Sequence, residues 1–180
     1  MVVEDEEYKN VFLDKIPALR PAFEKEGTIT AANASTLNDG ASALILVSEE
    51  AVEKYGLKPI AKIVSYADAA QEPEWFTTAP SLAIPKALKM AGLKQSDIDL
   101  IELNEAFASQ SLAVIRETGL NPDIVNVNGG AIALGHPLGC TGAKLTIQLL
   151  DEMQRRKQRY GMVTACVGGG QGIAGIFERL

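Results

Sequence analysis

The sequence predicts a single α/β domain in which helices pack on a mixed β-sheet. Apolar runs long enough for buried strands alternate with segments of helical periodicity, which is typical of layered α/β folds. Two apolar runs near the C-terminus are separated only by a short glycine-rich stretch, which predicts a hairpin and therefore some antiparallel pairing. The length of 180 residues is that of one ordinary domain with a real hydrophobic core.

The first third of the chain is expected to be loop, then strand, short helix and strand. Residues 1–27 are polar and weakly periodic, and we expect a loop or extended connector there. The dense apolar run at 41–47 is long enough for a buried strand. Ser48 followed by two acids predicts a helix start, which Gly56 should end. The next strand is expected at 60–66.

Strands and helices alternate over the rest of the sequence. Ser81 is expected to cap a helix whose apolar residues recur at i, i+3, i+4 and i+7 and which ends at Gly92. Pro85 should lie in the first turn of that helix, where proline is tolerated. Further strands are expected at 97–103, 160–167 and 173–178, and further helices at 105–117 and 142–157.

Composition excludes several classes of function. A net charge of −6 and a pI near 4.9 argue against a nucleic-acid-binding surface. The sequence contains no run of 18 apolar residues, so it predicts no membrane-spanning helix. Its acidic start does not resemble a secretory signal. Two cysteines and one histidine, without close ligand spacing, predict neither a disulfide framework nor a zinc site. We expect a reducing, cytoplasmic location.

The only histidine, His136, lies in a glycine-rich loop between Gly135 and Pro137. The proline biases the preceding residue away from helical geometry, so the ring is expected on a rigid loop. A satisfied structural histidine is the alternative to a catalytic one. Because glycine surrounds it on several sides, we favour acid/base chemistry for His136.

Cys166 closes an apolar run just before three glycines. It is either an inert buried cysteine or, with an imidazole nearby, a base or nucleophile. The N–H groups of the following glycines could hold an oxyanion. The other thiol, Cys140, lies near a helix start, and we interpret its surroundings as small-residue packing at the helix entry.

Two further stretches are candidates for the site. Asn104 lies at a strand-to-helix junction, where it either caps the helix or turns its amide toward a cleft to orient water or substrate. The small residues at 32–35 and 38–40 form either a simple turn or the lining of a narrow channel.

Together these motifs resemble the thiolase family. The NEAF sequence at 104–107, the glycine-rich stretch at 129–142 and the Cys-x-Gly-Gly-Gly-x-Gly run at 166–172 match its three C-terminal signatures in order and spacing. The stretches 19–23 and 33–40 resemble its earlier landmarks. The similarity covers nearly the whole chain from Leu19, and three ordered motifs make it specific.

The resemblance implies a fold and a chemistry. The fold implied is a thiolase-like layered αβα domain with a mixed, mostly five-stranded sheet, which is one half of the duplicated thiolase fold. The C-terminal domain would occupy 28–180, after the tail of a preceding loop segment at 1–27. The activity implied is that of an acetyl-CoA C-acetyltransferase, which forms acetoacetyl-CoA from two acetyl-CoA by Claisen condensation or cleaves it and other 3-ketoacyl-CoA by thiolysis. Coenzyme A thioesters are then substrates, and no cofactor or metal is expected.

The resemblance also implies roles for particular residues. Cys166 would be the acid/base thiol, and His136 would stabilise the enolate and help to activate a nucleophilic thiol. Asn104 would hold a water of the oxyanion hole, and the N–H of Gly168 would belong to the second oxyanion hole. The pantetheine channel and its apolar wall would be lined by Ser35, Ala31, Phe23 and Phe107.

One departure from the family is large. Thiolases carry their acyl-accepting cysteine in a Cys-x-Ser-Gly-like motif of the N-terminal half, and no such motif occurs here. We therefore expect the isolated chain to be inactive, to require an N-terminal thiolase half, and to associate through an apolar face; the full-length protein would form a homo-oligomer. The alternatives are a non-catalytic assembly or folding module and a domain related to ketoacyl synthases.

Overall fold

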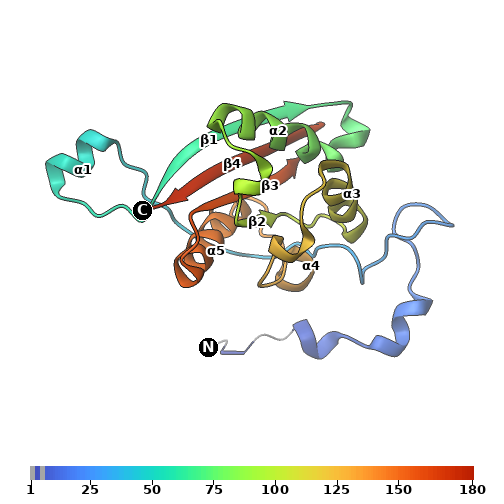
Figure 1. Cartoon of the computed structure of the whole chain (residues 1–180). Helices are drawn as coiled ribbons and strands as arrows, with labels where there is room; N and C mark the ends of the chain where they lie inside the picture. Colours follow the sequence, from blue (N-terminus) through green and yellow to red (C-terminus); the bar gives the residue numbers. More distant parts are fainter. Residues whose placement is uncertain (1–2, 5–6) are drawn as a thin grey trace.

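The centre of the computed structural model, which describes residues 3–4 and 7–180, is a four-stranded mixed sheet (Figure 1). Strands β1 and β3 both run antiparallel to β4, which lies between them, whereas β2 runs parallel to β3. The predicted hairpin is therefore confirmed as β3–β4. In sheet order the strands are β1 (Ala61–Ala70), β4 (Gln171–Arg179), β3 (Tyr160–Val167) and β2 (Leu100–Leu103).

Helices cover both faces of this sheet and give three layers. Helices α2 (Pro80–Ala91) and α3 (Ala108–Thr118) supply the larger core on one face. Helix α5 (Thr141–Arg156) packs on β2 and β3 from the other face. The α/β layered class is confirmed. The shorter helices are α1 (Glu49–Tyr55), α4 (Ala131–Leu134) and the 3₁₀ turns Glu7–Asn10, Leu13–Ala18, Pro73–Thr78, Gln95–Asp97 and Pro122–Ile124.

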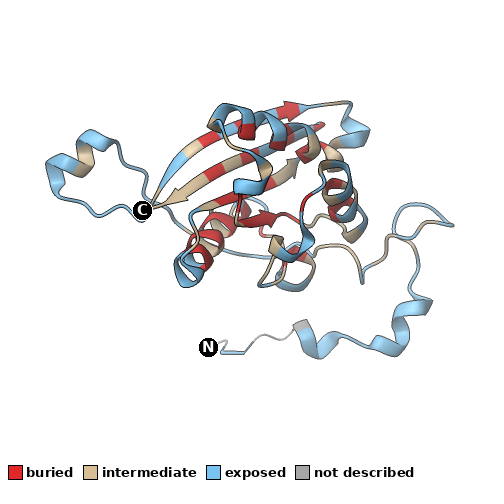
Figure 2. Ribbon diagram, viewed as in Figure 1, coloured by how far each residue is buried: buried red, intermediate tan, exposed pale blue. Residues whose placement is uncertain are grey.

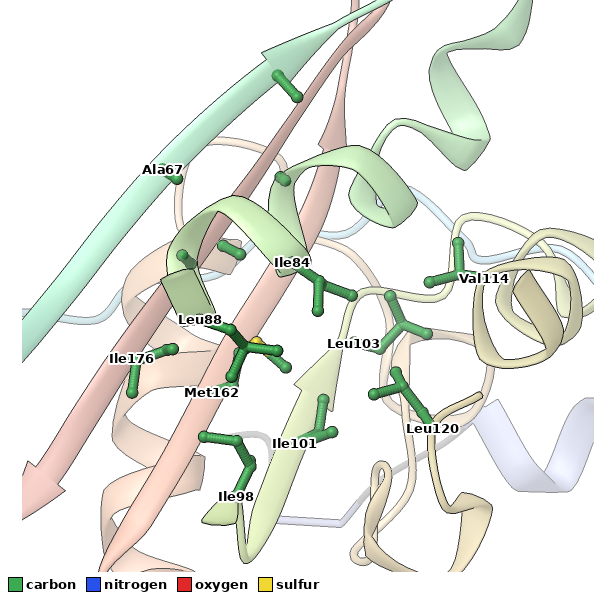
Figure 3. Packing of buried hydrophobic residues seen from close by; sticks show 14 residues of the cluster. Ala67, Ile84, Leu88, Ile98, Ile101, Leu103, Val114, Leu120, Met162 and Ile176 are labelled. Carbon is green, nitrogen blue, oxygen red and sulfur yellow. The ribbon is translucent and has the colours of Figure 1, made fainter. Parts of the chain in front are cut away.

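The two cores are separated by the alternation of β2. Side chains of successive strand residues point to opposite faces. Ile101 and Leu103 join the larger cluster, in which Ile84 and Leu88 of α2 pack against the sheet (Figure 3). Leu100 joins the smaller cluster with α5. The next residue on the α5 face is Glu102, a carboxyl only 2% exposed.

The segment before β1 lies outside the sheet, and Figure 2 shows it almost entirely exposed. The prediction of a buried strand at 41–47 was wrong in this structure, since those residues form no strand and most of them are exposed. The sheet accordingly has four strands, whereas the resemblance implied mostly five. The apolar character that predicted burial is real, but no sheet edge in the described chain receives this segment.

Helix boundaries agree with their capping signals in most places. Ser48 accepts a hydrogen bond from Ala51 N at 3.2 Å, and Gly56 adopts φ 59°, so both predicted ends of α1 are confirmed. The predicted cap at Ser81 was wrong, because α2 begins at Pro80 and the Ser81 hydroxyl donates to Glu117 instead. Pro85 consequently lies inside α2 rather than in its first turn.

Candidate functional site

The site is built where β2 ends and the chain turns toward α3. The N–H of Asn104 donates to Thr164 O at 2.9 Å, which continues the β2–β3 pairing one residue beyond the strand. Asn104 is only 1% exposed, and its side-chain Oδ1 has no hydrogen-bond partner in residues 3–4 and 7–180. Asn104 does not cap α3, because that helix begins at Ala108 with Phe107 as its N-cap residue. A buried polar atom of this kind is costly unless a water or ligand satisfies it.

Glu105 connects this junction to the glycine-rich loop. Its carboxylate accepts hydrogen bonds from Asn126 Nδ2 at 3.2 Å and from Ile132 N at 3.1 Å. The carboxylate lies so close to Gly130 that a methyl group there would overlap it. Glycine is therefore required at 130 by close approach. Glu105 stands in the NEAF motif at 104–107, but the sequence pattern predicted no role for it.

Asn126 reinforces the same junction from a strained position. It has φ 49°, a left-handed conformation that asparagine tolerates better than most residues. Its side-chain amide accepts from Leu103 N and donates to Leu103 O, both at 2.8 Å. The amide thus makes the two hydrogen bonds that the backbone of a neighbouring strand would make, and it fixes the end of β2.

An extended segment, residues 33–38, joins the β2 junction to the histidine loop. Ser35 N donates to Ala106 O at 3.1 Å, and its hydroxyl donates to the same carbonyl at 3.3 Å. One residue further along this segment, Thr36 O accepts a hydrogen bond from His136 N at 2.9 Å. Single β-bridges pair Ala34 with Phe107 and Leu37 with His136. The small-residue stretch thus brings two motifs together that are about 30 positions apart in the sequence.

His136 is held in a defined tautomer by Thr141. The ring Nδ1 lies 2.7 Å from Thr141 Oγ1, and that hydroxyl donates its proton to Pro137 O at 2.9 Å. Because the hydroxyl proton is used, the ring Nδ1 must donate, which leaves Nε2 as the acceptor in the neutral ring. Burial, and then the nearby Lys144 charge, lower the pKa of His136. The neutral ring is therefore favoured at neutral pH.

Cys166 is the last residue but one of β3, opposite Gly172 of β4. It is a free, partly buried thiol, and burial raises its pKa. The hairpin turn beyond it uses Gly169 and Gly170 at φ 80° and 91°, whereas Gly168 is exposed. Cys166 lies two residues along β3 from Thr164, the backbone partner of Asn104.

The sequence-predicted residues divide into those that the structure joins and those that it leaves apart. The segment that carries Ser35 binds the His136 loop and the carbonyl of Ala106, two residues after Asn104. Phe23 meets Phe107 edge-on with ring centroids 5.6 Å apart. Phe23 itself is 71% exposed, and Ala31 and Gly168 are also exposed. In the described part of the chain, His136 and Cys166 are connected through these neighbours rather than by a direct hydrogen bond.

The second thiol lies beside a surface depression. This depression, of about 370 Å³, is lined by residues 38–42 and 137–140. Cys140 Sγ lies 3.0 Å from Ser42 Oγ, and Gly40 packs closely on Pro137. These contacts agree with small-residue packing at the entry of α5.

No helix of the described residues is long and apolar enough to cross a membrane.

Comparison with known proteins gives a consistent result. The family described as "Thiolase, C-terminal domain" matches residues 57–179, and "Thiolase, N-terminal domain" matches residues 1–50. The 3-ketoacyl-CoA thiolase of Bacillus subtilis is 55% identical over 165 residues, which cover 92% of this chain and 42% of that protein. The cytosolic acetyl-CoA acetyltransferase of Gibberella zeae is 50% identical over 179 residues, 99% of this chain and 45% of that protein.

Solved structures extend the comparison to the fold. The crystal structure of human mitochondrial 3-ketoacyl-CoA thiolase in complex with CoA superposes with a TM-score of 0.94 at 47% identity. That match covers 100% of this chain and 46% of the human chain. The acetyl-CoA acetyltransferase of Bacillus anthracis gives a TM-score of 0.90, and 93% of this chain covers 42% of it. The chain thus spans somewhat less than half the length of the relatives it matches.

Proposed function

Because the chain belongs to the thiolase family, we propose that it is the C-terminal half of an acetyl-CoA C-acetyltransferase. In this proposal it supplies the acid/base cysteine and the oxyanion-hole groups for Claisen condensation or thiolysis of acetoacetyl-CoA and other 3-ketoacyl-CoA. Coenzyme A thioesters are the substrates, and no further cofactor takes part. A domain related to ketoacyl synthases has less support, since a thiol stands at position 166.

The observation that carries the proposal is the amide oxygen of Asn104, which has no hydrogen-bond partner in the part of the chain that the structure describes. It is buried at the end of a strand, beside the segment that also holds the His136 loop. A water bound to Asn104 would satisfy that oxygen and would present a proton toward a thioester oxygen. Enolate formation beside a thioester needs such fixed donors, because the α-proton is only weakly acidic.

His136 suits a role that begins with proton acceptance. The neutral ring, with Nδ1 bound to Thr141, offers a free Nε2 acceptor that can take the proton of a nucleophilic thiol. The resulting imidazolium then donates from Nε2 to the developing enolate oxygen. The lowered pKa of His136 favours the neutral starting state.

Cys166 suits the complementary role of acid and base for the substrate α-carbon. Its raised pKa keeps the thiol protonated, so in thiolysis it can protonate the departing enolate carbon and become a thiolate. In condensation the order reverses: Cys166 gives its proton to the CoA thiolate released on acylation of the nucleophilic thiol, and the resulting Cys166 thiolate then removes the α-proton and returns to the thiol. The N–H of Gly168, on the hairpin that follows, is proposed for the second oxyanion hole.

The substrate channel is proposed along the segment that crosses the site. The small side chains of Ala31 and Ser35 leave room for a pantetheine arm, and the contact between Phe23 and Phe107 gives an apolar wall. Phe23 is largely exposed in this chain, so a bound arm would cover it.

The nucleophile is proposed to come from an N-terminal thiolase half. Both cysteines of the sequence fall in C-terminal motifs, so no thiol remains to accept the acyl group. The isolated chain is therefore proposed to be inactive. We place it in the cytoplasm, where one relative is described as cytosolic and where free thiols persist.

The test compares the chain alone with the chain joined to the N-terminal half of a full-length relative. Thiolysis of acetoacetyl-CoA by CoA should be at background for the chain alone and well above it for the joined protein. In the joined protein, Asn104→Ala should lower kcat by about 10²- to 10³-fold, as for loss of one oxyanion donor. Cys166→Ser should remove activity.

Cys140→Ser is the matched control, because it also removes one thiol but leaves the proposed chemistry intact. Turnover by the isolated chain, or equal activity of the Cys166→Ser and Cys140→Ser proteins, would contradict the proposal. An inactive but well-assembled joined protein would favour a non-catalytic assembly module. The exposed apolar segment at 41–47 is the observation that supports this second candidate.

A further inference from the structure

We propose that Glu102 is a positioning residue for the His136 loop and acts on it through Gln148 and Lys144 of α5. The inference rests on the proposed role of His136, but its geometry lies outside the site described above. Glu102 is on β2 and faces α5, where the smaller of the two cores is packed. Nothing in the proposed chemistry uses this carboxyl.

One arm of the connection runs through Gln148. Its Nε2 donates to Glu102 Oε2 at 3.1 Å and to Gly129 O at 3.3 Å. Gly129 begins the glycine-rich loop and has φ 91°, a conformation that side chains rarely adopt. One amide group therefore joins the buried carboxylate to the start of the loop.

The second arm runs through Lys144, one helical turn before Gln148 on the same face of α5. Its Nζ donates to Gly135 O at 3.3 Å, the carbonyl immediately before His136. The loop between Gly129 and His136 is thus held at both ends by two side chains of one helix. Both of these side chains also act on Glu102, Gln148 by its hydrogen bond and Lys144 by its charge.

Burial makes the charge of Glu102 responsive to pH in the range where an enzyme works. Loss of solvent raises its pKa to about 7, and the opposing effects of Gln148 and Lys144 only partly offset this. The other charged groups that act on it are Glu105, at the end of its own strand, and Glu152 on α5. Lys144 is also the charge that lowers the pKa of His136. Ionisation of Glu102 therefore adds a negative charge beside the same lysine that acts on His136.

His136 and Glu102 are expected to titrate in different ranges of pH. Burial and the Lys144 charge lower the pKa of His136, whereas burial raises the pKa of Glu102 to about 7, so the two groups shift in opposite directions. The ring signals of His136 should therefore show two inflections, one from the ring and one near pH 7 from Glu102. Coupled groups that share a neighbour report each other in this way.

The test uses nuclear magnetic resonance of the full chain, in which His136 is the only histidine and its ring signals are unambiguous. In the unmodified protein we expect two inflections in the pH titration of these signals. Glu102→Gln keeps an acceptor for Gln148 but cannot ionise, and it should leave a single inflection. Lys144→Met should also remove the second inflection and should raise the pKa of His136.

Glu178→Gln is the matched control, because it also removes one carboxylate. Glu178 lies near the end of β4, where it pairs with Lys62 and Arg159 and not with Gln148 or Lys144. This variant should keep both inflections. Gln148→Met offers a variant that cuts only the first arm, and it should shift the backbone signals of residues 129–136. A single inflection in the unmodified protein, or two in Glu102→Gln, would overturn the proposal. Because no step needs turnover, failure here is distinct from inactivity of the joined enzyme.

Discussion

At the scale of single residues, several side chains carry a cost that the fold alone does not require. Asn104 has a buried oxygen without a partner among the described residues, Asn126 lies at positive φ, and Glu102 holds a carboxyl in an apolar core. All three lie on β2, just beyond it, or against it. Such concentrated costs are typical of functional sites, where the surrounding structure over-determines a strained or desolvated group.

The cost of Glu102 should appear as a pH dependence of stability. Its pKa is about 7 in the folded chain, against 4.5 when exposed, so the folded state holds the proton over that range and stability falls as pH rises. Each unit of pKa corresponds to about 1.4 kcal/mol, which sets the loss at about 3 kcal/mol above pH 7. Glu102→Gln should abolish this loss of stability. The free energy of unfolding of the variant, relative to that of the unmodified chain, should therefore increase between pH 5.5 and 8.

Urea unfolding at several pH values measures this difference. Glu178→Gln serves as the control, because the pKa of Glu178 is lowered by Lys62 and Arg159, so that carboxyl is ionised over most of this range. Its difference from the unmodified chain should be nearly constant from pH 5.5 to 8. A constant difference for Glu102→Gln as well would show that the buried carboxyl costs nothing extra when ionised.

The sequence predicted the candidate site as far as its motifs extend. His136, Cys166 and Asn104 could be chosen because glycine-rich loops and a strand end mark them. Thr141, Lys144 and Glu102 could not, because their roles depend on which face of α5 and β2 meets the loop. A threonine five residues after a histidine has no meaning until α5 begins at Thr141 and turns its hydroxyl back to the ring.

At the scale of elements, local signals decided the boundaries well wherever the chain meets solvent. The strand expected at 160–167 is β3 as observed, and the helices predicted to end at Gly56 and Gly92 do so, each with that glycine in the left-handed region. Errors arose where tertiary contacts override local preference. Helix α3 begins at Ala108 rather than 105, because residues 105–107 pair with the 33–35 segment instead.

The packing of α5 on β3 depends on the lack of a side chain at Gly161. A methyl group there would lie 2.5 Å from the Met153 sulfur and 2.8 Å from a Leu149 methyl carbon, so these two buried side chains of α5 would have to shift. Gly161→Ala should therefore lower the free energy of unfolding by about 1–3 kcal/mol, the usual cost of overpacking a core. Chemical denaturation followed by circular dichroism measures the effect.

Gly175 of the neighbouring strand β4 is the matched control. A methyl group there would meet only the Phe177 ring, at 3.5 Å, which is ordinary contact. Gly175→Ala should be neutral or more stable by about 0.4–1 kcal/mol, since it restricts the unfolded chain. Similar losses in the free energy of unfolding for both variants would mean that glycine is required by strand geometry and not by the packing of α5 on β3.

At the scale of the whole molecule, the chain consists of a well-packed αβα body and a long segment before β1 that has no buried residue among those described. Figures 1 and 2 show the contrast, since buried residues gather around the sheet while α1 and the N-terminal stretch project from it. The layered class followed from strand and helix order alone. The exposed position of residues 41–47 could not be predicted in this way. An apolar pattern predicts that a segment is buried, but it does not show whether the fold offers a surface to bury it.

This exposed segment should drive association of the chain. Ile45 and Leu46 are 90% and 76% exposed within a continuous apolar run, and such a run is a template for pairing with another chain. We expect dimers or larger species in light scattering coupled to gel filtration. Replacing both residues with lysine should shift the distribution toward the monomer, because two charges cannot be buried in the contact. Met90→Lys adds a charge at another exposed apolar position, on α2, and should change nothing. A clean monomer for the unmodified chain would show that the segment is tolerated in water, and the apolar run would then need another explanation.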